Sequence, residues 1–514
     1  MAGRGLRPYM RLTMMRAPRP LPPARSLSRG GAIVGVLLLA GCQVGPEYAK
    51  PAPDIPASYR AGDPATAPMA TPATDWWKGF GSGELDALMA DAASNSFDVR
   101  AAIARVGQAD AQLRAAGAAL LPEVDASSKA GWSRSTVSTA KIATGPNGLS
   151  LTTGQRATEQ RSYSLGPNLS YELDFWGAIR SGQQAAAASA LFSRYDRQTV
   201  TLTTLGATAT TWFTALAYQD RLAVAENNLK DSEEILAAIR ARLEVGTASM
   251  LDVAQEEALV AGIRANLPNL RNLRDQEVAA LAILVGRLPE AVPVPAGTLT
   301  ALQLPAVSPG LPSTLLARRP DVASAEAQLV AQNANMRVAR AAFFPTITLT
   351  GSAGWQSTAL QTLLNGQSLL FNAAANAAQT IFDNGKLAAQ YEQAKARYDE
   401  LLVDYEKAVV QAFTDVETAL IQWRETTEQE TLEAEAVRTA QRAADIARAQ
   451  VEAGTLDIVT ALQTQSTLYA DQDTLAQVRL ARVLALVNLY KALGGGWSAS
   501  DVMPPDTPIF NGVL

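Results

Sequence analysis

The segment Glu244-Val245-Gly246-Thr247 recurs 208 residues later as Glu452-Ala453-Gly454-Thr455. The same offset relates three further pairs of identical residues, namely Gly177 and Gly385, Gln255 and Gln463, and Gly286 and Gly494. About 110 residues therefore align without a gap. A repeat of this length indicates one structural unit that the chain contains twice.

Upstream of this region the two copies remain related, but at an offset of 223 residues. The matching pairs are Asp98-Val99 and Asp321-Val322, Pro122 and Pro345, and Gly131-Trp132 and Gly354-Trp355. The change of offset places a 15-residue insertion between Trp132 and Gly177 of the first copy. Because length changes are tolerated best at loop tips, we expect the insertion at such a tip.

Each copy begins with a predicted helix followed by two strands. Residues 98–120 and 321–343 are rich in alanine and carry apolar residues at helical spacing. After Pro122 and Pro345 the period changes to two, which predicts a strand with one apolar and one small polar face. The second strand is predicted from Tyr163 to Leu173 and, with weaker alternation, from Phe371 to Ile381.

Two long helices follow. No proline interrupts the sequence from Gly177 to Glu244 or from Gly385 to Glu452. Each stretch of roughly 65 residues predicts a helix on the order of 100 Å long. Each ends at a Gly-Thr pair, where glycine can adopt the left-handed cap, and a return helix then runs to Gly286 or Gly494. The pair Arg318-Arg319 is expected to tie down the start of the second copy. The fold is therefore mainly α with a small sheet, built from a duplicated strand-strand-long helix-helix repeat.

The chain begins like an exported protein. Its first thirty residues contain seven arginines and no acid, and the apolar run Ala32 to Ala40 follows. This run is too short to span a ~30 Å hydrocarbon core as a helix, which favours a cleaved signal over an anchor. Leu39-Ala40-Gly41-Cys42 resembles a bacterial lipobox, so Cys42, the only thiol, is the predicted lipidation site; the alternative is a buried apolar Cys. Gln43, in place of Asp, favours outer-membrane sorting.

The composition excludes several classes of function. The chain has 514 residues, no His and one Cys, so histidine-based nucleophiles and histidine-ligated zinc, iron or haem sites are excluded. Residues 42–514 carry 37 Lys and Arg against 49 Asp and Glu, a balance of −12, which disfavours a nucleic-acid partner. We therefore expect no catalytic activity, and no cofactor or metal beyond the covalent lipid on Cys42.

These observations divide the chain into six parts. They are a lipoprotein signal peptide (1–41), a lipidated N-terminal wrapping segment (42–97), the first repeat (98–287), a Pro-rich linker (288–320), the second repeat (321–494) and a C-terminal tail (495–514).

The four amphipathic strands predict an oligomer. A membrane-spanning barrel needs at least about eight strands, because an open sheet edge in lipid leaves backbone groups unpaired. Two copies of the chain supply eight strands and three supply twelve, and the strand number alone does not choose between them. Twelve strands leave a lumen for water and solutes, whereas eight are largely filled by side chains. The alternative is a soluble β-hairpin packed on the helices.

Several motifs resemble the TolC-like outer-membrane factors, in the lipoprotein branch of OprM and the NodT group. They are Cys42-Gln43-Val44-Gly45-Pro46-Glu47-Tyr48, Trp76-Trp77 with Leu85-Asp86-Ala87-Leu88, Tyr171-Glu172-Leu173-Asp174-Phe175-Trp176-Gly177, and Arg318-Arg319-Pro320-Asp321 continuing to Ala341-Ala342-Phe343-Phe344-Pro345. The resemblance implies a homotrimer with a 12-stranded β-barrel in the outer membrane and a long periplasmic α-barrel. It also implies a tip that opens when a periplasmic adaptor and an inner-membrane pump engage, and a passive conduit for drugs, metals or secreted proteins.

The resemblance places a pore constriction at the turn of the second repeat. Relatives commonly carry Asp where this chain has Gln463, so we expect a closure made by Val459 and Gln463 with Asp457 close by. The alternative is that Asp457 caps a helix and Val459 packs within it. The equivalent residues of the first repeat, Met250, Leu251 and Asp252, are expected to face the adaptor or to pair.

Trp132 and Trp355 end the strand patterns, and we interpret them as membrane-interface aromatics. The most favoured function is the outer-membrane channel of a tripartite efflux pump. The alternatives are a type I protein-secretion channel, a periplasmic adaptor or scaffold lipoprotein and, least favoured, a lipid-anchored periplasmic enzyme. An adaptor normally has one helical hairpin, whereas this sequence predicts two.

Overall fold

The computed structural model describes residues 44–53, 55–56, 58–60, 73–145, 148–305, 315–498 and 502. Cys42 and the signal peptide lie outside the described residues. The α-helices are α2 (Gly83–Asn95), α3 (Phe97–Ala118), α4 (Ala178–Glu244), α5 (Met250–Val285), α7 (Pro320–Ala341), α8 (Lys386–Glu452) and α9 (Ile458–Ala492). The strands are β1 (Glu123–Gly145), β2 (Gly148–Leu173), β3 (Thr346–Ser357) and β4 (Leu369–Ala378). Short 3-10 helices are η1 (Trp76–Phe80), η2 (Pro289–Ala291), η3 (Leu299–Ala301), η4 (Leu360–Thr362) and η5 (Gly366–Ser368).

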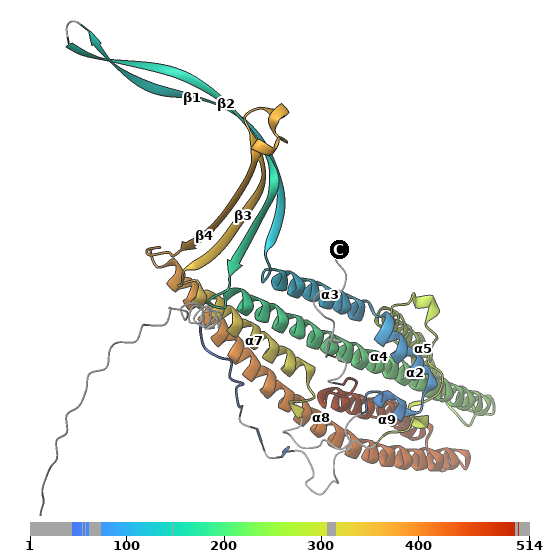
Figure 1. Cartoon of the computed structure of the whole chain (residues 1–514). Coiled ribbons are helices and arrows are strands. Elements are labelled where there is room, and N and C mark those ends of the chain that lie inside the picture. The colour runs from blue at the N-terminus through green and yellow to red at the C-terminus, as the bar shows by residue number, and fades with distance from the viewer. Residues whose placement is uncertain are drawn as a thin grey trace, which may run out of the picture.

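The four strands form one antiparallel sheet in the order β1-β2-β3-β4, which stands on one end of the helical region (Figure 1). The strands β1 and β2 have 23 and 26 residues, whereas β3 and β4 have 12 and 10. β3 pairs with β2 only between Tyr163 and Leu173, so the β1–β2 pair projects beyond the β3–β4 pair. The insertion therefore lies in β1 and β2, within the interval that the sequence predicts.

Several details of the strand predictions are wrong. The second strand begins at Gly148 and not at Tyr163. Trp132 does not end a strand, because β1 continues to Gly145. The insertion lengthens both strands of the hairpin instead of its loop. The fourth strand is Leu369–Ala378 rather than Phe371 to Ile381, because Leu369 and Leu370 pair with the end of β3.

The long helices α4 and α8 have the predicted bounds, and each contains 67 residues. Each begins after a glycine in the left-handed conformation, Gly177 or Gly385. A carboxylate just upstream accepts hydrogen bonds from amides at the start of each helix: Asp174 from Ile179 and Arg180, and Asp383 from Gly385 and Leu387. These bonds satisfy amides that have no partner within the helix and fix where it starts.

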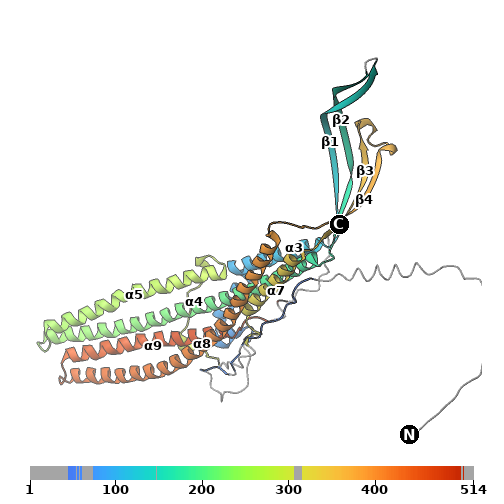
Figure 2. The same cartoon turned by 90° about the vertical axis from the view of Figure 1, so that its left-hand side faces the viewer.

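The long helices and their return helices form two antiparallel hairpins. We call α4 with α5 hairpin 1 and α8 with α9 hairpin 2. The two hairpins run side by side away from the sheet (Figure 2). Within the described part of the chain, no helix has the length and apolar character needed to cross a membrane.

The main hydrophobic core lies between the two repeats, near the middle of the helical region. Trp76 of η1 stacks on Tyr490 of α9 with 5.0 Å between ring centroids, and Phe80 packs on Phe213 of α4 at 4.9 Å. The linker joins this core, because the amide of Gln303 donates to the carbonyl of Phe80 at 3.2 Å. Residues 76–80 thus contact both repeats, and the linker contacts these residues.

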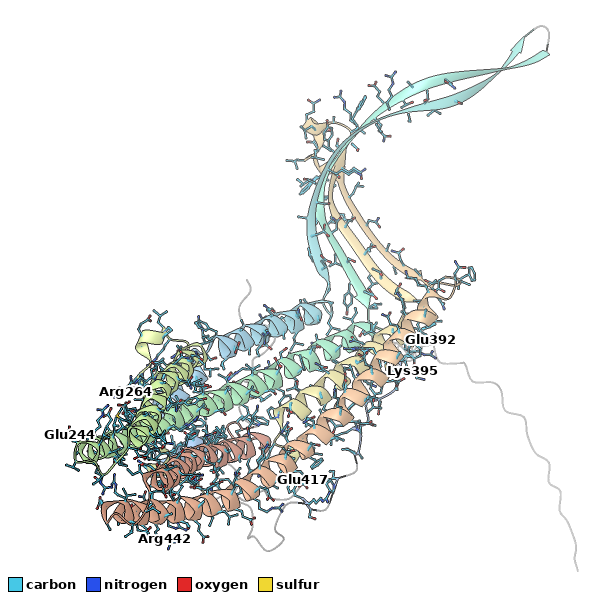
Figure 3. All side chains as sticks on the ribbon, turned by 180° about the vertical axis from the view of Figure 1, so that it is seen from behind. Glu244, Arg264, Glu392, Lys395, Glu417 and Arg442 are labelled. Carbon is cyan, nitrogen blue, oxygen red and sulfur yellow. The ribbon has the colours of Figure 1, made fainter. Side chains whose placement is uncertain are left out.

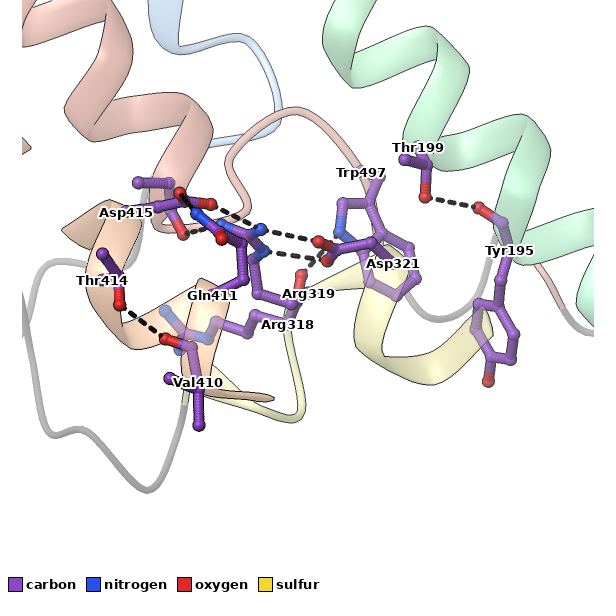
Figure 4. A network of polar contacts seen from close by, with 11 residues as sticks. Tyr195, Thr199, Arg318, Arg319, Asp321, Val410, Gln411, Thr414, Asp415 and Trp497 are labelled. Carbon is purple, nitrogen blue, oxygen red and sulfur yellow. Dashed lines mark hydrogen bonds and ion pairs between the residues drawn. The ribbon is translucent and has the colours of Figure 1, made fainter. Parts of the chain in front are cut away.

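A buried arginine fixes the start of the second repeat (Figure 4). The guanidinium of Arg319 bonds to Asp321 at 2.8 and 2.6 Å, to Asp415 of α8 at 2.9 Å and to the carbonyl of Ala492 in α9 at 3.2 Å. The indole of Trp497 donates to the carbonyl of Arg318 at 2.8 Å. The expected role of the Arg318-Arg319 pair is confirmed, since these contacts tie the linker to α7, α8 and α9.

Candidate functional site

Both hairpins turn at the end of the molecule away from the sheet. Figure 3 labels one residue of each long helix near this end: Glu244, the last residue of α4, and Arg442, ten residues before the end of α8. Each turn contains a glycine in the left-handed conformation, Gly246 with a φ of 77° and Gly454 with a φ of 74°. The following threonine donates its amide to a carbonyl of the last helical turn at 2.9 Å in both repeats. The two turns therefore share one backbone geometry.

In hairpin 2, Asp457 is the residue that caps the N-terminus of α9. Its carboxylate accepts the amide of Thr460 at 2.9 Å and the Thr460 hydroxyl at 2.7 Å. These hydrogen bonds from Thr460 hold the pKa of Asp457 below its usual value. The capping role left open by the sequence is thus observed for Asp457.

Val459 does not pack within the helix end, since 44% of it is exposed. Gln463 is also exposed and lies four residues later on α9. Residues at this spacing share one helix face. The structure therefore presents Val459 and Gln463 as one exposed strip that starts at the turn of hairpin 2.

In hairpin 1, Ser249 and Asp252 form a reciprocal capping box at the start of α5. The Ser249 hydroxyl accepts the amide of Asp252 at 3.2 Å, and the Asp252 carboxylate accepts the amide of Ser249 at 2.7 Å. Met250 and Leu251 point into solvent, with 69% and 64% exposed. Together with the exposed Val245, they form what we call the apolar tip patch.

The interior of hairpin 1 contains a buried apolar cluster close to its tip. Leu236, Ile239, Val253 and Val260 form a buried cluster there, and Ile458 of hairpin 2 packs against it. In α8, by contrast, Ala447 is the single buried residue after Leu420. The lower half of α8 therefore buries less apolar surface than α4 does, whereas α9 still buries Leu468 and Leu475.

One ionisable residue is buried at the tip of hairpin 1. Glu256, one turn after Val253, is 0% exposed, and within the described part of the chain neither carboxylate oxygen has a hydrogen-bond partner. Burial raises the pKa of Glu256 to about 7. Burial, with a smaller contribution from the Glu256 carboxylate, also raises the pKa of the Tyr469 hydroxyl of α9. Sequence reasoning missed this residue, because one Glu beside another reads as a solvated helix face.

A few polar contacts join the two hairpins near the tip. Arg242 of α4 donates to the carbonyls of Val451 and Glu452, the last residues of α8, at 2.7 and 3.3 Å. Higher up, Arg221 pairs with Asp473 of α9 at 2.7 Å, and the hydroxyls of Ser232 and Tyr469 lie 3.3 Å apart. No motif signals these contacts in the sequence. They link residues that are more than 200 positions apart.

Between these contacts, α4, α8 and α9 enclose a cavity of about 380 Å³. Its lining includes Asp231, Arg242, Arg448, Leu462 and Tyr469. The hairpins are therefore incompletely packed against each other beside the tip. Among the described residues, no three His, Cys, Asp or Glu side chains lie together as a set that could hold a metal ion.

The sheet has one apolar face and one polar face. Leu165 and Leu169 of β2 share their side with Trp355 of β3, because Leu165 pairs with Trp355 in the register. The opposite side carries Asn168, whose amide donates to Asp125 and Ser127 of β1 at 2.9 Å. Trp132, which is 63% exposed, lies on the apolar side through its pairing with Arg161.

Comparison with known proteins gives this architecture a context. The family model described as outer membrane efflux protein matches residues 88–287 and 311–495. The pyoverdine export outer membrane protein OpmQ of Pseudomonas aeruginosa is 41% identical over 424 residues, which cover 82% of this chain and 88% of OpmQ. The toluene efflux pump outer membrane protein TtgC of Pseudomonas putida is 34% identical over 472 residues, covering 90% of this chain and 94% of TtgC. The solved structure of the Campylobacter jejuni CmeC outer membrane channel matches with a TM-score of 0.80 at 25% identity, covering 89% of this chain and 96% of CmeC.

Proposed function

Since the chain belongs to the outer membrane efflux protein family and is an outer-membrane efflux channel, we propose that three copies form one conduit. Their twelve strands close a β-barrel in the outer membrane, and their hairpins form an α-barrel that extends into the periplasm. Cys42 carries the lipid anchor. The channel performs no catalysis and needs no cofactor. Its partners are a periplasmic adaptor and an inner-membrane pump.

The observation that carries this proposal is the two-faced, open sheet. In the described sheet, β1 and β4 each have one edge without a strand partner. The apolar side runs from Leu173 to Tyr163, eleven residues that span about 33 Å along the strand. At a strand tilt of about 40° this distance corresponds to a band of about 25 Å, which matches the apolar band of outer-membrane barrels. Joining the free edges of neighbouring copies pairs every edge and turns the Asn168 side toward a wet lumen.

We assign the pore constriction to hairpin 2. Val459 and Gln463 are exposed on one face of α9, and Asp457 fixes the start of that helix. The lower half of α8 has little buried apolar surface, and hairpin 2 is joined to hairpin 1 there by a few polar contacts and by Ile458. Such contacts cost less to break than a packed seam, so hairpin 2 is the part that moves when the channel opens.

We assign the adaptor contact to hairpin 1. The apolar tip patch of Val245, Met250 and Leu251 projects from a turn held by the Ser249 and Asp252 capping box. Exposed apolar side chains on a rigid support are suited to binding a partner. The patch lies on the hairpin whose buried cluster extends to the tip, which provides that rigidity.

We propose that the pump, rather than this channel, selects the cargo. OpmQ is described as exporting pyoverdine and TtgC as belonging to a toluene efflux pump, and both align along most of this chain. Relatives of one architecture thus serve chemically different compounds. A wide, water-filled tube discriminates little between solutes, which agrees with this range.

Two measurements test the proposal. The mass of the purified protein in detergent should equal three chains, and the protein should form ion-conducting channels in a planar bilayer. A water-soluble monomer that conducts no ions would overturn the proposal. Chains with and without Cys42→Ser separate the lipid claim from the channel claim: the variant should lose its acyl mass and retain its conductance.

A further inference from the structure

The apolar side of the sheet carries aromatic residues at its end nearest the turn between β1 and β2. Tyr163 is the last residue of β2 that pairs with β3, opposite Ser357. On β1, the partner of Tyr163 is Ala130. Two residues closer to the turn between β1 and β2, Trp132 of β1 pairs with Arg161 of β2. Partners in an antiparallel pair point to the same side, so Trp132, Tyr163 and Arg161 share the side of Leu165.

Arg161 therefore stands just beyond the apolar band, between two aromatic rings. It is exposed, and within the described part of the chain its side chain makes no hydrogen bond or ion pair. The nearest acid along β2 on the same side, Glu159, instead pairs with Arg134 at 3.9 Å. A shallow hollow of about 550 Å³ opens here, lined by Ala130, Gly131, Trp132, Arg161 and Tyr163.

The position of this hollow suits one kind of ligand. Trp and Tyr rings at the end of an apolar band lie at the level of the lipid headgroups. A guanidinium one step further out reaches the headgroup phosphates, which it binds with two parallel hydrogen bonds. The apolar surface begins beside the hollow, because Leu165 follows Tyr163 on the same side of β2. A phosphate that carries acyl chains satisfies both parts of this surface, whereas free phosphate satisfies the guanidinium alone.

We propose that the hollow of Trp132, Arg161 and Tyr163 binds the phosphate of an acylated, phosphorylated headgroup in the outer leaflet. Arg161 holds the phosphate, and the two rings contact the headgroup and the upper part of the acyl chains. The site rests on the proposed orientation of the sheet, in which the Leu165 side faces lipid. It places a specific lipid at the outer rim of each protomer.

The chain supplies a matched control for Arg161. Lys129 is an exposed cation on β1 that pairs with Ser164, and it therefore lies on the opposite, lumen-facing side at nearly the same height. Arg161→Gln and Lys129→Gln each remove one exposed positive charge. They change the net charge equally and differ in the side of the sheet that they affect.

The test measures binding of lipid A to the purified oligomer by native mass spectrometry. Arg161→Gln should weaken binding about tenfold, Lys129→Gln should leave it unchanged, and Trp132→Ala should weaken it by a smaller factor. The unaltered protein should bind lipid A with its phosphates removed about tenfold more weakly. Equal loss with Lys129→Gln, or equal binding of the dephosphorylated lipid, would overturn the site.

Two further arms complete the experiment. Millimolar inorganic phosphate should not displace lipid A, and full displacement would show a free-anion site instead. Conductance is recorded from the same Arg161→Gln preparation and should be unchanged. A preparation that conducts normally and binds lipid A as tightly as the unaltered protein refutes the lipid site alone. An unaltered protein that conducts no ions would refute the proposed function.

Discussion

The two hairpins have the same backbone but differ in what holds them together. Both long helices have 67 residues, and both turns have the same left-handed glycine. At the repeat offset, however, three of the four buried residues of hairpin 1 become small: Leu236, Ile239 and Val253 correspond to Ala444, Ala447 and Ala461, whereas Val260 corresponds to the buried Leu468. The two hairpins therefore share one geometry but not one seam, since alanines take three of the four positions in hairpin 2. Hairpin 1 has the larger buried cluster at its tip, and hairpin 2 contacts it there through Ile458 and a few hydrogen bonds.

The residues that cap the return helices also differ between the two hairpins, but both helix starts keep their hydrogen bonds. In hairpin 1, Ser249 caps α5, and the carboxylate of Asp252 accepts the amide of Ser249. In hairpin 2, Asp457 caps α9, and the hydroxyl of Thr460 donates to the Asp457 carboxylate. The carboxylate and the hydroxyl have exchanged places, and both helix starts remain satisfied. The starts of the helices are therefore conserved in function while the interiors are not.

The largest difference between the hairpins should come from shortening one isoleucine in each. Ile239→Ala removes a side chain that is 3% exposed and should cost about 2–5 kcal/mol, because it leaves a cavity in the buried cluster. Ile446→Ala removes one that is 59% exposed and should cost less than about 0.5 kcal/mol. Hydrogen exchange of the backbone amides at the two tips measures both effects. Similar losses would mean that hairpin 2 has a seam as strong as that of hairpin 1.

A rise in pH from 5 to 8 should affect hairpin 1 alone. The pKa of Glu256 is raised in the folded tip, so the neutral form contributes stability that is fully present below about 4.5 and is lost as the pH rises to about 7. The difference of about 2.5 pKa units corresponds to roughly 3 kcal/mol above neutral pH. Protection of residues 250–260 from hydrogen exchange, corrected for the intrinsic rate, should fall between pH 5 and 8. Glu256→Leu should abolish this fall.

Glu257 is the matched control for Glu256. It is the next residue on α5, it is exposed, and it pairs with Arg240 at 2.6 Å. Glu257→Gln should leave the pH dependence intact. A fall in protection that persists in Glu256→Leu would contradict the assignment of the titrating group.

These assignments show what sequence reasoning could and could not reach. The ends of α4 and α8 were predictable, because helix-stopping glycines and the absence of proline act locally. The seam of hairpin 1 and its loss in hairpin 2 required knowing which face of each helix is covered. Glu256 and Arg242 were not predictable, because burial and a contact across the two repeats depend on tertiary packing. The extension of β1 past Trp132 was missed because its Ser- and Thr-rich strand alternates weakly.

Cutting one contact between the hairpins should have a moderate effect. Arg242→Met removes the donor to the carbonyls of Val451 and Glu452 and should favour opening by about 1 kcal/mol, roughly a fivefold change in the ratio of open to closed channels. Single-channel recording measures this ratio. Arg448→Met alters a cation of the same cavity and should have little effect. An equal response in both variants would point to charge in the cavity and not to the Arg242 contact.

The smallest expected effects concern the caps. Asp457→Ala should reduce protection only in the first turn of α9, and Ser249→Ala only in the first turn of α5. Because the pKa of Asp457 is lowered in the fold, its contribution is present above the ordinary carboxyl pKa and is lost as the pH falls below it. Hydrogen exchange at acidic pH should therefore mimic Asp457→Ala at the start of α9. Fraying that spreads along the whole helix would show that the cap holds more than one turn.

The most direct test of the account compares the two tips in one planar bilayer. Val459→Ala with Gln463→Ala shortens the exposed strip of hairpin 2, and Met250→Ala with Leu251→Ala shortens the apolar tip patch of hairpin 1. The closed-state leak conductance should rise several-fold in the first variant and stay unchanged in the second. An unchanged leak in the first variant, or a larger leak in the second, would contradict the assignment of the gate to hairpin 2.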